Sequence, residues 1–202
     1  MTFDEAINFL QQRTPLRITL SGDIGSGKST FSKRLVEELG IERVSAGELM
    51  REEAKRRGIT LDELNEIYEQ DDKSDRRLDK MQQEKAREVE RGVFEGRLAW
   101  HFVENPDARV FLAADPEVAA ERVWGDMNNP QRDKYESQES LRKANIERKK
   151  SETKRYKEYY DLDAYDRANF DVAVDTSKLS IDEVYKQTII KIAELIKELD
   201  EK

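Results

Sequence analysis

The sequence contains no cysteine, and His101 is its only histidine. The lack of cysteine excludes disulfide bonds, thiolate nucleophiles and cysteine-based zinc sites, and one histidine cannot build a histidine-rich metal centre. No apolar run approaches the roughly 18 residues of a membrane-spanning helix. Acidic residues precede the first apolar stretch, unlike the order in a secretory signal. We therefore expect a soluble, cytoplasmic protein with no membrane partner.

Basic residues are fewer than acidic ones, 36 against 44, which gives a formal net charge of −8 over 202 residues. This balance argues against polymeric nucleic acid as a partner, although a local basic pocket stays possible. The length suits a single domain, residues 1–202, and no Pro- or Gly-rich linker divides it. We expect a monomer; the apolar stripe of the last helix is already needed for the core and indicates no partner.

Short apolar runs alternate with helical patterns along the chain. Strands are predicted at 16–22, near Val44, and at 92–96, 109–114 and 170–177. Helices are predicted at the first 15 or so residues, packed on the sheet edge, at 30–40, over most of 48–91, and after the Asp115-Pro116 cap. In the last helix one stripe holds Tyr185, Ile189, Ile192, Ile196 and Leu199. This alternation predicts an α/β fold with a doubly wound, five-stranded parallel sheet.

The stretch GDIGSGKST between the first strand and the first long helix fits the phosphate-loop pattern G-x-x-x-x-G-K-[ST]. Glycines let backbone N–H groups turn around phosphate oxygens, and the following helix points its positive end at the same anion. Lys28 can reach the β and γ phosphates, which makes it a predicted catalytic residue, and the Ser29 hydroxyl can ligate Mg²⁺. We expect the Asp23 carboxylate to face outward. The predicted nucleotide-binding residues are Gly22, Asp23, Ile24, Gly25, Ser26, Gly27, Lys28, Ser29 and Thr30.

Among phosphate-loop proteins, a small-molecule kinase explains most of the chain. The sequence lacks an N-K-x-D-like motif for guanine recognition, which disfavours a switch GTPase. The small size of the chain disfavours an ATP-driven motor. The insertion at 48–91 suits a clamp on a second substrate. Arg148, Glu152 and Arg155 share one helical face that could close over phosphates and a ribose. The same spacing also suits an ordinary solvent-exposed helix.

Three further segments carry a resemblance: SAGELMREEAKRRGITLDELNEIYEQD, VFEGRLAW and IERKKSETKRYKEYYDLDAYD. With the phosphate loop they resemble the cytidylate kinase family, especially its short archaeal-type branch, from about residue 17 to the end. The resemblance implies a P-loop nucleoside monophosphate kinase that uses ATP and Mg²⁺ to convert CMP or dCMP into CDP or dCDP. It divides the chain into a core (16–47, 92–118 and 168–202), an NMP-binding insertion (48–91) and a lid (119–167).

The resemblance also implies roles for single residues. Arg51 matches an arginine that grips the acceptor phosphate, and Arg97 matches a second arginine that serves the acceptor nucleotide. Ser45 and Gly47 complete the predicted acceptor site, and Arg122 matches an arginine near the donor nucleotide. Arg148, Glu152 and Arg155 match the lid pattern of the family. The resemblance implies that Arg148 and Arg155 are catalytic residues and that Glu152 and Arg155 bind the acceptor.

Two alternatives stay open. A kinase of the same fold for AMP, UMP or a small alcohol would share the phosphate loop, and the polar 48–91 segment could read several bases. A nucleotide-binding protein without useful turnover would keep Lys28 and Ser29 but lack an ordered acceptor site. The roles of Asp23 and Glu95 also stay open. The family commonly has Gly-Pro-Pro-Gly where this chain has Gly-Asp-Ile-Gly, so Asp23 departs from the family pattern. Glu95 either orients the waters of Mg²⁺ or bonds to neighbouring backbone.

Overall fold

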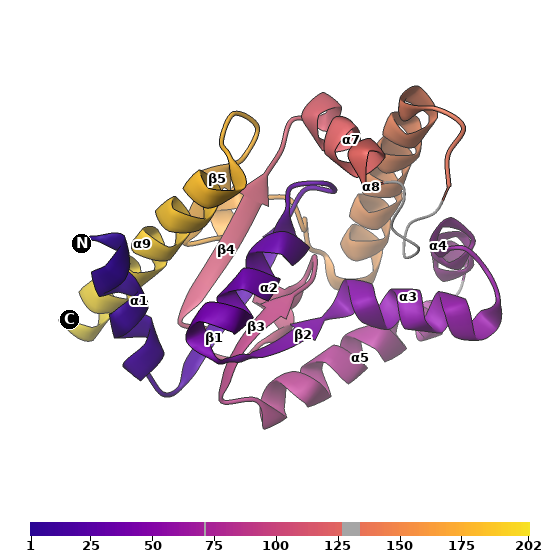
Figure 1. Ribbon diagram of the computed structural model, residues 1–202. Helices are drawn as coiled ribbons and strands as arrows, with labels where there is room; N and C mark the ends of the chain where they lie inside the picture. The colour runs from indigo at the N-terminus through magenta and orange to yellow at the C-terminus, as the bar shows by residue number, and fades with distance from the viewer. Residues whose placement is uncertain (71, 127–133) are drawn as a thin grey trace.

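The computed structural model describes residues 1–70, 72–126 and 134–202. At its centre lies a five-stranded parallel sheet in the order β2-β3-β1-β4-β5 (Figure 1). The predicted α/β fold is confirmed. The phosphate loop follows β1 at the point where the strand order reverses, which is where such sheets bind ligands. The strands are β1 (Leu16–Gly22), β2 (Glu42–Ser45), β3 (Arg91–Glu95), β4 (Ala108–Ala113) and β5 (Val172–Asp175).

Helices cover both faces of the sheet. Successive side chains of β3 point to opposite faces, so Val93 joins the core under one set of helices and Phe94 joins the core under the other. The first set comprises α1 (Phe3–Gln12), α2 (Lys28–Leu39) and α9 (Ile181–Asp200). The second set includes α5 (Asp72–Glu88) and the short α6 (Ala99–Phe102). This two-sided burial is what a doubly wound fold requires.

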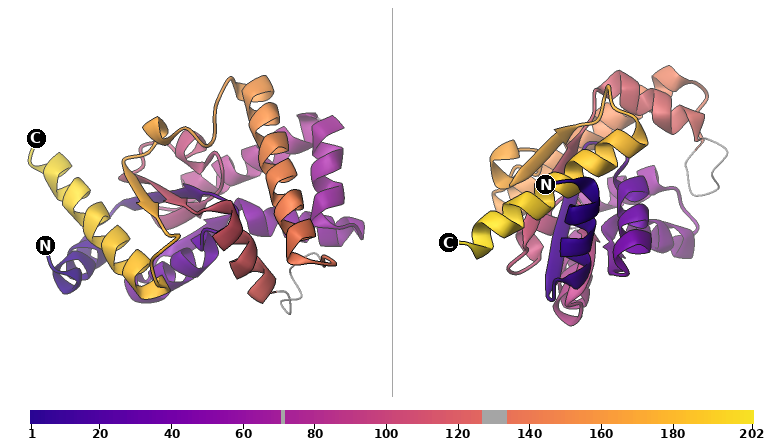
Figure 2. Two further views of the ribbon diagram at one scale, coloured as in Figure 1. Left: turned by 90° about the horizontal axis from the view of Figure 1, so that it is seen from above. Right: turned by 60° about the vertical axis from the view of Figure 1, so that its left-hand side comes forward.

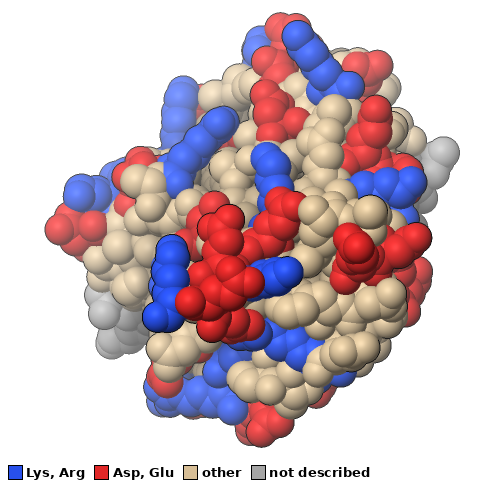
Figure 3. All heavy atoms as spheres, turned by 90° about the vertical axis from the view of Figure 1, so that its left-hand side faces the viewer, with Lys and Arg blue, Asp and Glu red and all other residues tan. Residues whose placement is uncertain are grey.

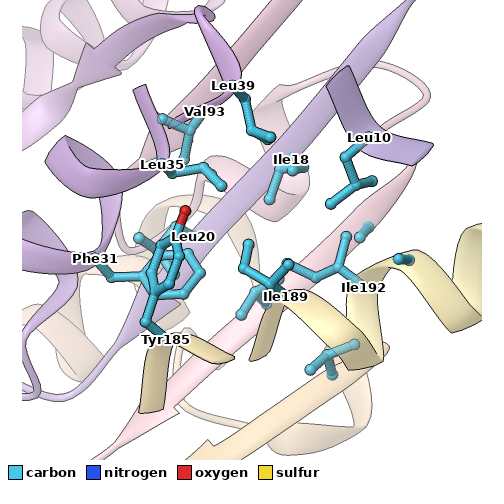
Figure 4. Packing of buried hydrophobic residues seen from close by; sticks show 14 of the residues in the cluster. Leu10, Ile18, Leu20, Phe31, Leu35, Leu39, Val93, Tyr185, Ile189 and Ile192 are labelled. Carbon is cyan, nitrogen blue, oxygen red and sulfur yellow. The ribbon is translucent and has the colours of Figure 1, made fainter. Parts of the chain in front are cut away.

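The larger core lies between β1 and the first set of helices. Figure 4 shows Leu10, Ile18, Phe31, Leu35 and Ile189 converging from α1, β1, α2 and α9. The predicted stripe of α9 is buried up to Ile196, but Leu199 is 53% exposed, so its inclusion was wrong. Leu199 lies in the last turn of the helix, past the final core residue. The prediction that α1 packs at the sheet edge was also wrong, because Leu10 enters the core beside the central strand.

The remaining helices stand at one end of the molecule, opposite the two chain termini (Figures 1 and 2). Of these, α8 contacts both α7 and α4, and so spans the space between them. No helix in the described ranges is long and apolar enough to cross a membrane. The elements of this end are α3 (Ala46–Arg57), α4 (Leu61–Gln70), α7 (Pro116–Gly125) and α8 (Gln138–Tyr160), with the 3₁₀ helix η1 (Arg167–Asn169) preceding β5.

Candidate active site

The phosphate loop is shaped by glycines that no other residue could replace without a shift of backbone. Gly22 has φ +146°, and a Cβ at this position would lie 2.1 Å from the carbonyl oxygen of Leu112 on β4. Gly27 has φ +88° and precedes the first turn of α2 without any side-chain cap. The N–H groups of that first turn are therefore available for an anion, which the positive end of the helix also favours.

Lys28 is the cation of this loop, and it lies partly buried against the loop's own backbone. Its Nζ donates hydrogen bonds to the carbonyl oxygens of Gly22, at 3.0 Å, and Asp23, at 2.5 Å. Burial and the nearby Arg97 lower the pKa of Lys28 to about 7, against the opposing effect of neighbouring carboxylates. A bound phosphate would favour the protonated form of this lysine.

Beside Lys28, the Ser29 hydroxyl donates to Glu95, a buried carboxylate at the end of β3. The Ser29 Oγ lies 2.8 Å from Glu95 Oε1, while Ser32 Oγ, at 2.9 Å, and Arg43 Nη2, at 2.6 Å, bind Oε2. Burial opposes ionisation of Glu95, but the positive charges of Arg43 and Lys28 prevail and keep its pKa below its usual value. Glu95 thus bonds to side chains rather than to neighbouring backbone, and its oxygens face the predicted metal ligand.

Arg43 was not found by sequence reasoning. Its side chain lies on β2, is 11% exposed, and forms ion pairs with both Glu95 and Glu48. The only signal in the sequence is an arginine inside a short strand, next to the buried Val44, and that pattern does not reveal its partners.

A pocket of about 190 Å³ opens beside Lys28 and Glu95. Four cationic side chains line it, and they come from α2, α3, the β3–α6 turn and α8, against two carboxylates. This excess of positive charge, on an acidic protein, suits phosphate groups. Its polar lining residues are Lys28, Ser29, Thr30, Arg51, Glu95, Arg97, Arg148 and Glu152, with Ile24, Gly25, Gly27, Ala46, Gly47, Met50, Gly96 and Tyr156 completing the wall.

Glu152 holds two of these arginines in place. Its oxygens accept hydrogen bonds from Arg97 Nε at 2.8 Å, Arg148 Nε at 3.0 Å and the Tyr165 hydroxyl at 2.6 Å. Burial disfavours its charge, but Arg97 and Arg148 outweigh burial and hold the pKa of Glu152 well below its usual range. Arg97 also donates from Nη1 to the carbonyl of Gly22 at 2.9 Å. Glu152 therefore stays ionised and fixes the two guanidinium groups at the pocket.

Three predicted residues lie beside this pocket rather than in its wall. Arg155 is buried on α8, and its Nη1 donates to Ser151 Oγ at 2.8 Å. Ser45 is the N-cap of α3, where its hydroxyl accepts from the N–H of Glu48. Gly22 contributes its carbonyl to Lys28 and Arg97. A direct substrate role for these residues stays a prediction. Tyr165, which no motif in the sequence singles out, donates its hydroxyl to Glu152.

A second pocket, of about 400 Å³, lies on the other side of the phosphate loop. Gly25, Gly27 and Thr30 line both pockets, so the loop stands between them. Arg122 borders the second pocket and donates to the hydroxyl, at 2.9 Å, and the carbonyl, at 2.6 Å, of Thr176. Its wall combines the apolar or aromatic residues Phe31, Val123, Leu179, Ile181, Val184 and Tyr185 with the polar residues Ser26, Arg34, Asp126 and Thr176. A pocket that combines apolar side chains with several polar groups is typical of a small-molecule site.

Asp23 lines neither pocket. Its carboxylate points away from both pockets, as an outward-facing side chain should, but it is only 15% exposed because other residues cover it. Oδ2 accepts from the backbone N–H of Ala114 at 3.1 Å, and Oδ1 accepts from Lys149 Nζ at 2.7 Å. The negative charge is neutralised by a cation of α8, which the sequence separation concealed.

Oxygen ligands for a metal ion are present at Ser29 and Glu95, as Mg²⁺ prefers. In the part of the chain that the structure describes, no three His, Cys, Asp or Glu side chains gather as a metal site. The protein would thus supply few ligands itself, which fits an ion that arrives with nucleotide phosphates.

Comparison with known proteins points in one direction. Residues 17–178 match the model of the cytidylate kinase-like family. A protein named cytidylate kinase from Natronomonas pharaonis is 44% identical over 83% of this chain and 84% of its own. Another of that name, from Haloarcula marismortui, is 40% identical over 80% and 81%. The solved structure of shikimate kinase from Acinetobacter baumannii, in complex with shikimate, has a TM-score of 0.57 at 18% identity, over 97% of this chain and 99% of that one. This last likeness concerns the fold.

Proposed function

Because the chain belongs to the cytidylate kinase-like family, we propose that it transfers the γ-phosphoryl group of ATP to the phosphate of CMP or dCMP. A phosphate oxygen of the acceptor forms a bond to the γ-phosphorus while the bond to the β–γ bridging oxygen breaks. The products are ADP and CDP or dCDP. The observation that carries the proposal is a phosphate loop that stands between two pockets, one with a partly apolar wall and one lined by Lys28 and three arginines.

The donor nucleotide fits the 400 Å³ pocket. Its base and ribose would lie among the apolar residues of α7 and α9, near Arg122, and its phosphates would follow the loop toward Lys28. The N–H groups at the start of α2 and the Lys28 ammonium would then surround the β and γ phosphates. Placing the phosphates there would displace Lys28 from the two backbone carbonyls it contacts.

The phosphate of the acceptor nucleotide would enter the 190 Å³ pocket, where it would meet Arg51, Arg97 and Arg148. Each guanidinium carries five N–H donors, so Arg97 and Arg148 can bind a phosphate while retaining their bonds to Glu152. Bringing two phosphate groups together is electrostatically unfavourable, and these cations offset that cost. Phosphoryl transfer depends on such positioning and charge neutralisation more than on any covalent catalyst.

We also propose that the nucleotide brings Mg²⁺, with Ser29 as its direct protein ligand and Glu95 close by. When bound, the ion neutralises charge on the β and γ phosphates. The buried Arg43 and Ser32 hold one oxygen of Glu95, so the other stays directed at Ser29. In this account α8 is the lid helix, and by covering the pocket with Arg148 and Glu152 it keeps water from the γ-phosphate.

The test is the rate of ADP formation from ATP and Mg²⁺ with CMP, dCMP, UMP, AMP, GMP, shikimate and gluconate in turn. We expect kcat/KM for CMP or dCMP to exceed that for every other acceptor. A higher value for AMP, UMP or an alcohol would assign the same fold to another acceptor. Equal, slow ADP release with every acceptor would identify a nucleotide-binding protein without useful transfer.

A further inference from the structure

The Asp23 side chain joins the phosphate loop to two other elements. Its backbone N–H donates to the carbonyl of Leu112 at 3.0 Å, and its Oδ2 accepts from the N–H of Ala114 at 3.1 Å, so the residue is fixed to the end of β4. The second carboxylate oxygen accepts from Lys149 Nζ of α8 at 2.7 Å. The core therefore presents a rigidly held negative charge to one lysine of α8.

Lys149 is held from its other side by Tyr165. Its Nζ lies 4.3 Å from the centre of the tyrosine ring, within the range of a cation–π interaction. The hydroxyl of the same ring donates to Glu152 at 2.6 Å, and Glu152 binds Arg148 and Arg97. The ion pair of Asp23 is thus connected, through Tyr165 and Glu152, to the arginines of the 190 Å³ pocket.

A second connection runs parallel to the first. Glu152 binds Arg97, and Arg97 donates to the carbonyl of Gly22, the loop residue that precedes Asp23. Lys149 and Glu152 are three residues apart and lie on one side of α8. Lys149 directly, and Glu152 through Arg97, therefore connect α8 to two consecutive residues of the phosphate loop. Together they fix the rotation of α8 about its axis, and hence the direction of Arg148.

We infer that Asp23 and Lys149 are positioning residues that hold α8 against the phosphate loop and so direct Arg148 toward the phosphoryl group that is transferred. Neither residue lines the pocket, so neither touches substrate in this arrangement. The inference rests on the proposed function for its catalytic consequence. Small displacements of a positioned group lower rates strongly, because the bound geometry has to be close to that of the transition state.

Loss of the Asp23–Lys149 ion pair should have a different effect from loss of an ion pair that only stabilises the fold. The side chain of Lys149 is 47% exposed and that of Asp23 is 15% exposed, so solvent screens the pair from the side of the lysine and its contribution to the stability of the folded state is small. Its loss should therefore appear in kcat, with little change in thermal stability or in the affinity for ATP, whose loop and donor pocket stay intact.

The experiment compares Lys149→Met, Asp23→Asn and the double variant, with Lys150→Met as the matched control. Lys150 is the next residue of α8 and pairs with Glu147 at the surface. We expect kcat with ATP and CMP to fall about fivefold in each single variant, the upper range for a pair of this exposure. The double variant should be no slower than either single one. KM for ATP and the melting temperature should stay near wild type, and Lys149→Arg should retain most of the rate.

Equal rates for Lys149→Met and Lys150→Met would overturn the inference, as would fully additive losses in the double variant. Hydrogen exchange of the α8 amides in the nucleotide-free protein provides a readout that needs no turnover. Faster exchange should follow from Lys149→Met and Asp23→Asn but not from Lys150→Met. If the wild type proves inactive with CMP, the proposed function fails, and the exchange result still decides whether the pair seats α8.

Discussion

Lys28 lies inside the phosphate loop with its ammonium group against two backbone carbonyls, and the same burial that places it there lowers its pKa to about 7. In the free protein it therefore exchanges its proton near neutral pH. Phosphates favour the protonated form, so ATP binding takes up a proton at higher pH.

ATP affinity should consequently fall as the pH is raised from about 7 to about 9, by at most about tenfold per pH unit. Calorimetry in two buffers of different ionisation enthalpy would measure the proton uptake directly. Lys28→Arg, which stays charged, should abolish that uptake, and a pH-independent wild-type affinity would contradict the assignment. For unfolding the sign is opposite. Between about 7 and the ordinary lysine value of 10.5 the unfolded chain binds the extra proton, so this residue makes stability rise with pH there.

Arg43 compensates the charge of Glu95 in the interior. Replacing it by methionine would leave that carboxylate buried without its main counter-ion, so Arg43→Met should lower the free energy of unfolding by about 3 kcal/mol. Denaturant unfolding measures this loss. Arg87→Met is the matched control, since Arg87 and its partner Glu104 are both more than half exposed, and it should cost less than about 0.5 kcal/mol. Equal losses in the two variants would show that Arg43 is an ordinary surface residue.

At the residue scale, the positions that a local motif defines were predictable, and those that depend on long-range pairing were not. The glycines and Lys28 follow from one continuous stretch, because the loop uses mostly its own backbone. Arg43, Lys149 and Tyr165 acquire their partners only when β2, α8 and the segment before β5 meet at the loop. Asp23 illustrates the difference, since the partner of its charge, Lys149, lies 126 residues away in the sequence.

At the scale of elements, the two pockets share the phosphate loop and α2, while their other helices differ: α7 and α9 line the proposed donor pocket, and α3 and α8 line the proposed acceptor pocket. Arg122 on α7 borders one pocket and Arg51 on α3 borders the other. Arg51→Ala should therefore raise KM for CMP by about 10- to 100-fold, the effect of losing a charge-assisted hydrogen bond or two, and leave ATP binding almost unchanged. Arg122→Ala should show the reverse. Steady-state kinetics with each substrate varied, together with thermal stabilisation by ATP, measures both effects. Equal losses for both nucleotides in either variant would show that its arginine is misplaced.

Helix and strand positions were largely predictable because caps and periodicity are local. The Asp115 cap forms as predicted, and Ser180 and Glu183 form a capping box at the start of α9. The errors come from tertiary packing. Strand β5 is shorter than predicted, 172–175 rather than 170–177, because Phe170 ends the 3₁₀ helix η1 and the chain turns away after Asp175 to meet Arg122 through Thr176. Leu199 continues the periodicity of α9 but extends past the surface on which that helix packs.

At the scale of the whole molecule, an acidic protein concentrates positive charge where polyanionic ligands would bind. The face that carries both termini shows acidic and basic side chains interspersed (Figure 3), within a formal net charge of −8. The pocket beside Lys28 instead has four cationic side chains against two carboxylates. Such a field favours nucleotides at the pocket over association elsewhere on the surface.

We propose that the two nucleotides meet at the phosphate loop, with the donor in the 400 Å³ pocket and the acceptor in the 190 Å³ pocket beside Lys28. A compound in which cytidine and adenosine are joined through five phosphates tests it most directly, with calorimetry as the readout. The account predicts one molecule bound per chain, competition with both ATP and CMP, and affinity at least about 100-fold above that of either nucleotide. It also predicts a large loss of that affinity in Arg51→Ala. Binding that competes with ATP alone, and that Arg51→Ala leaves unchanged, would contradict the account.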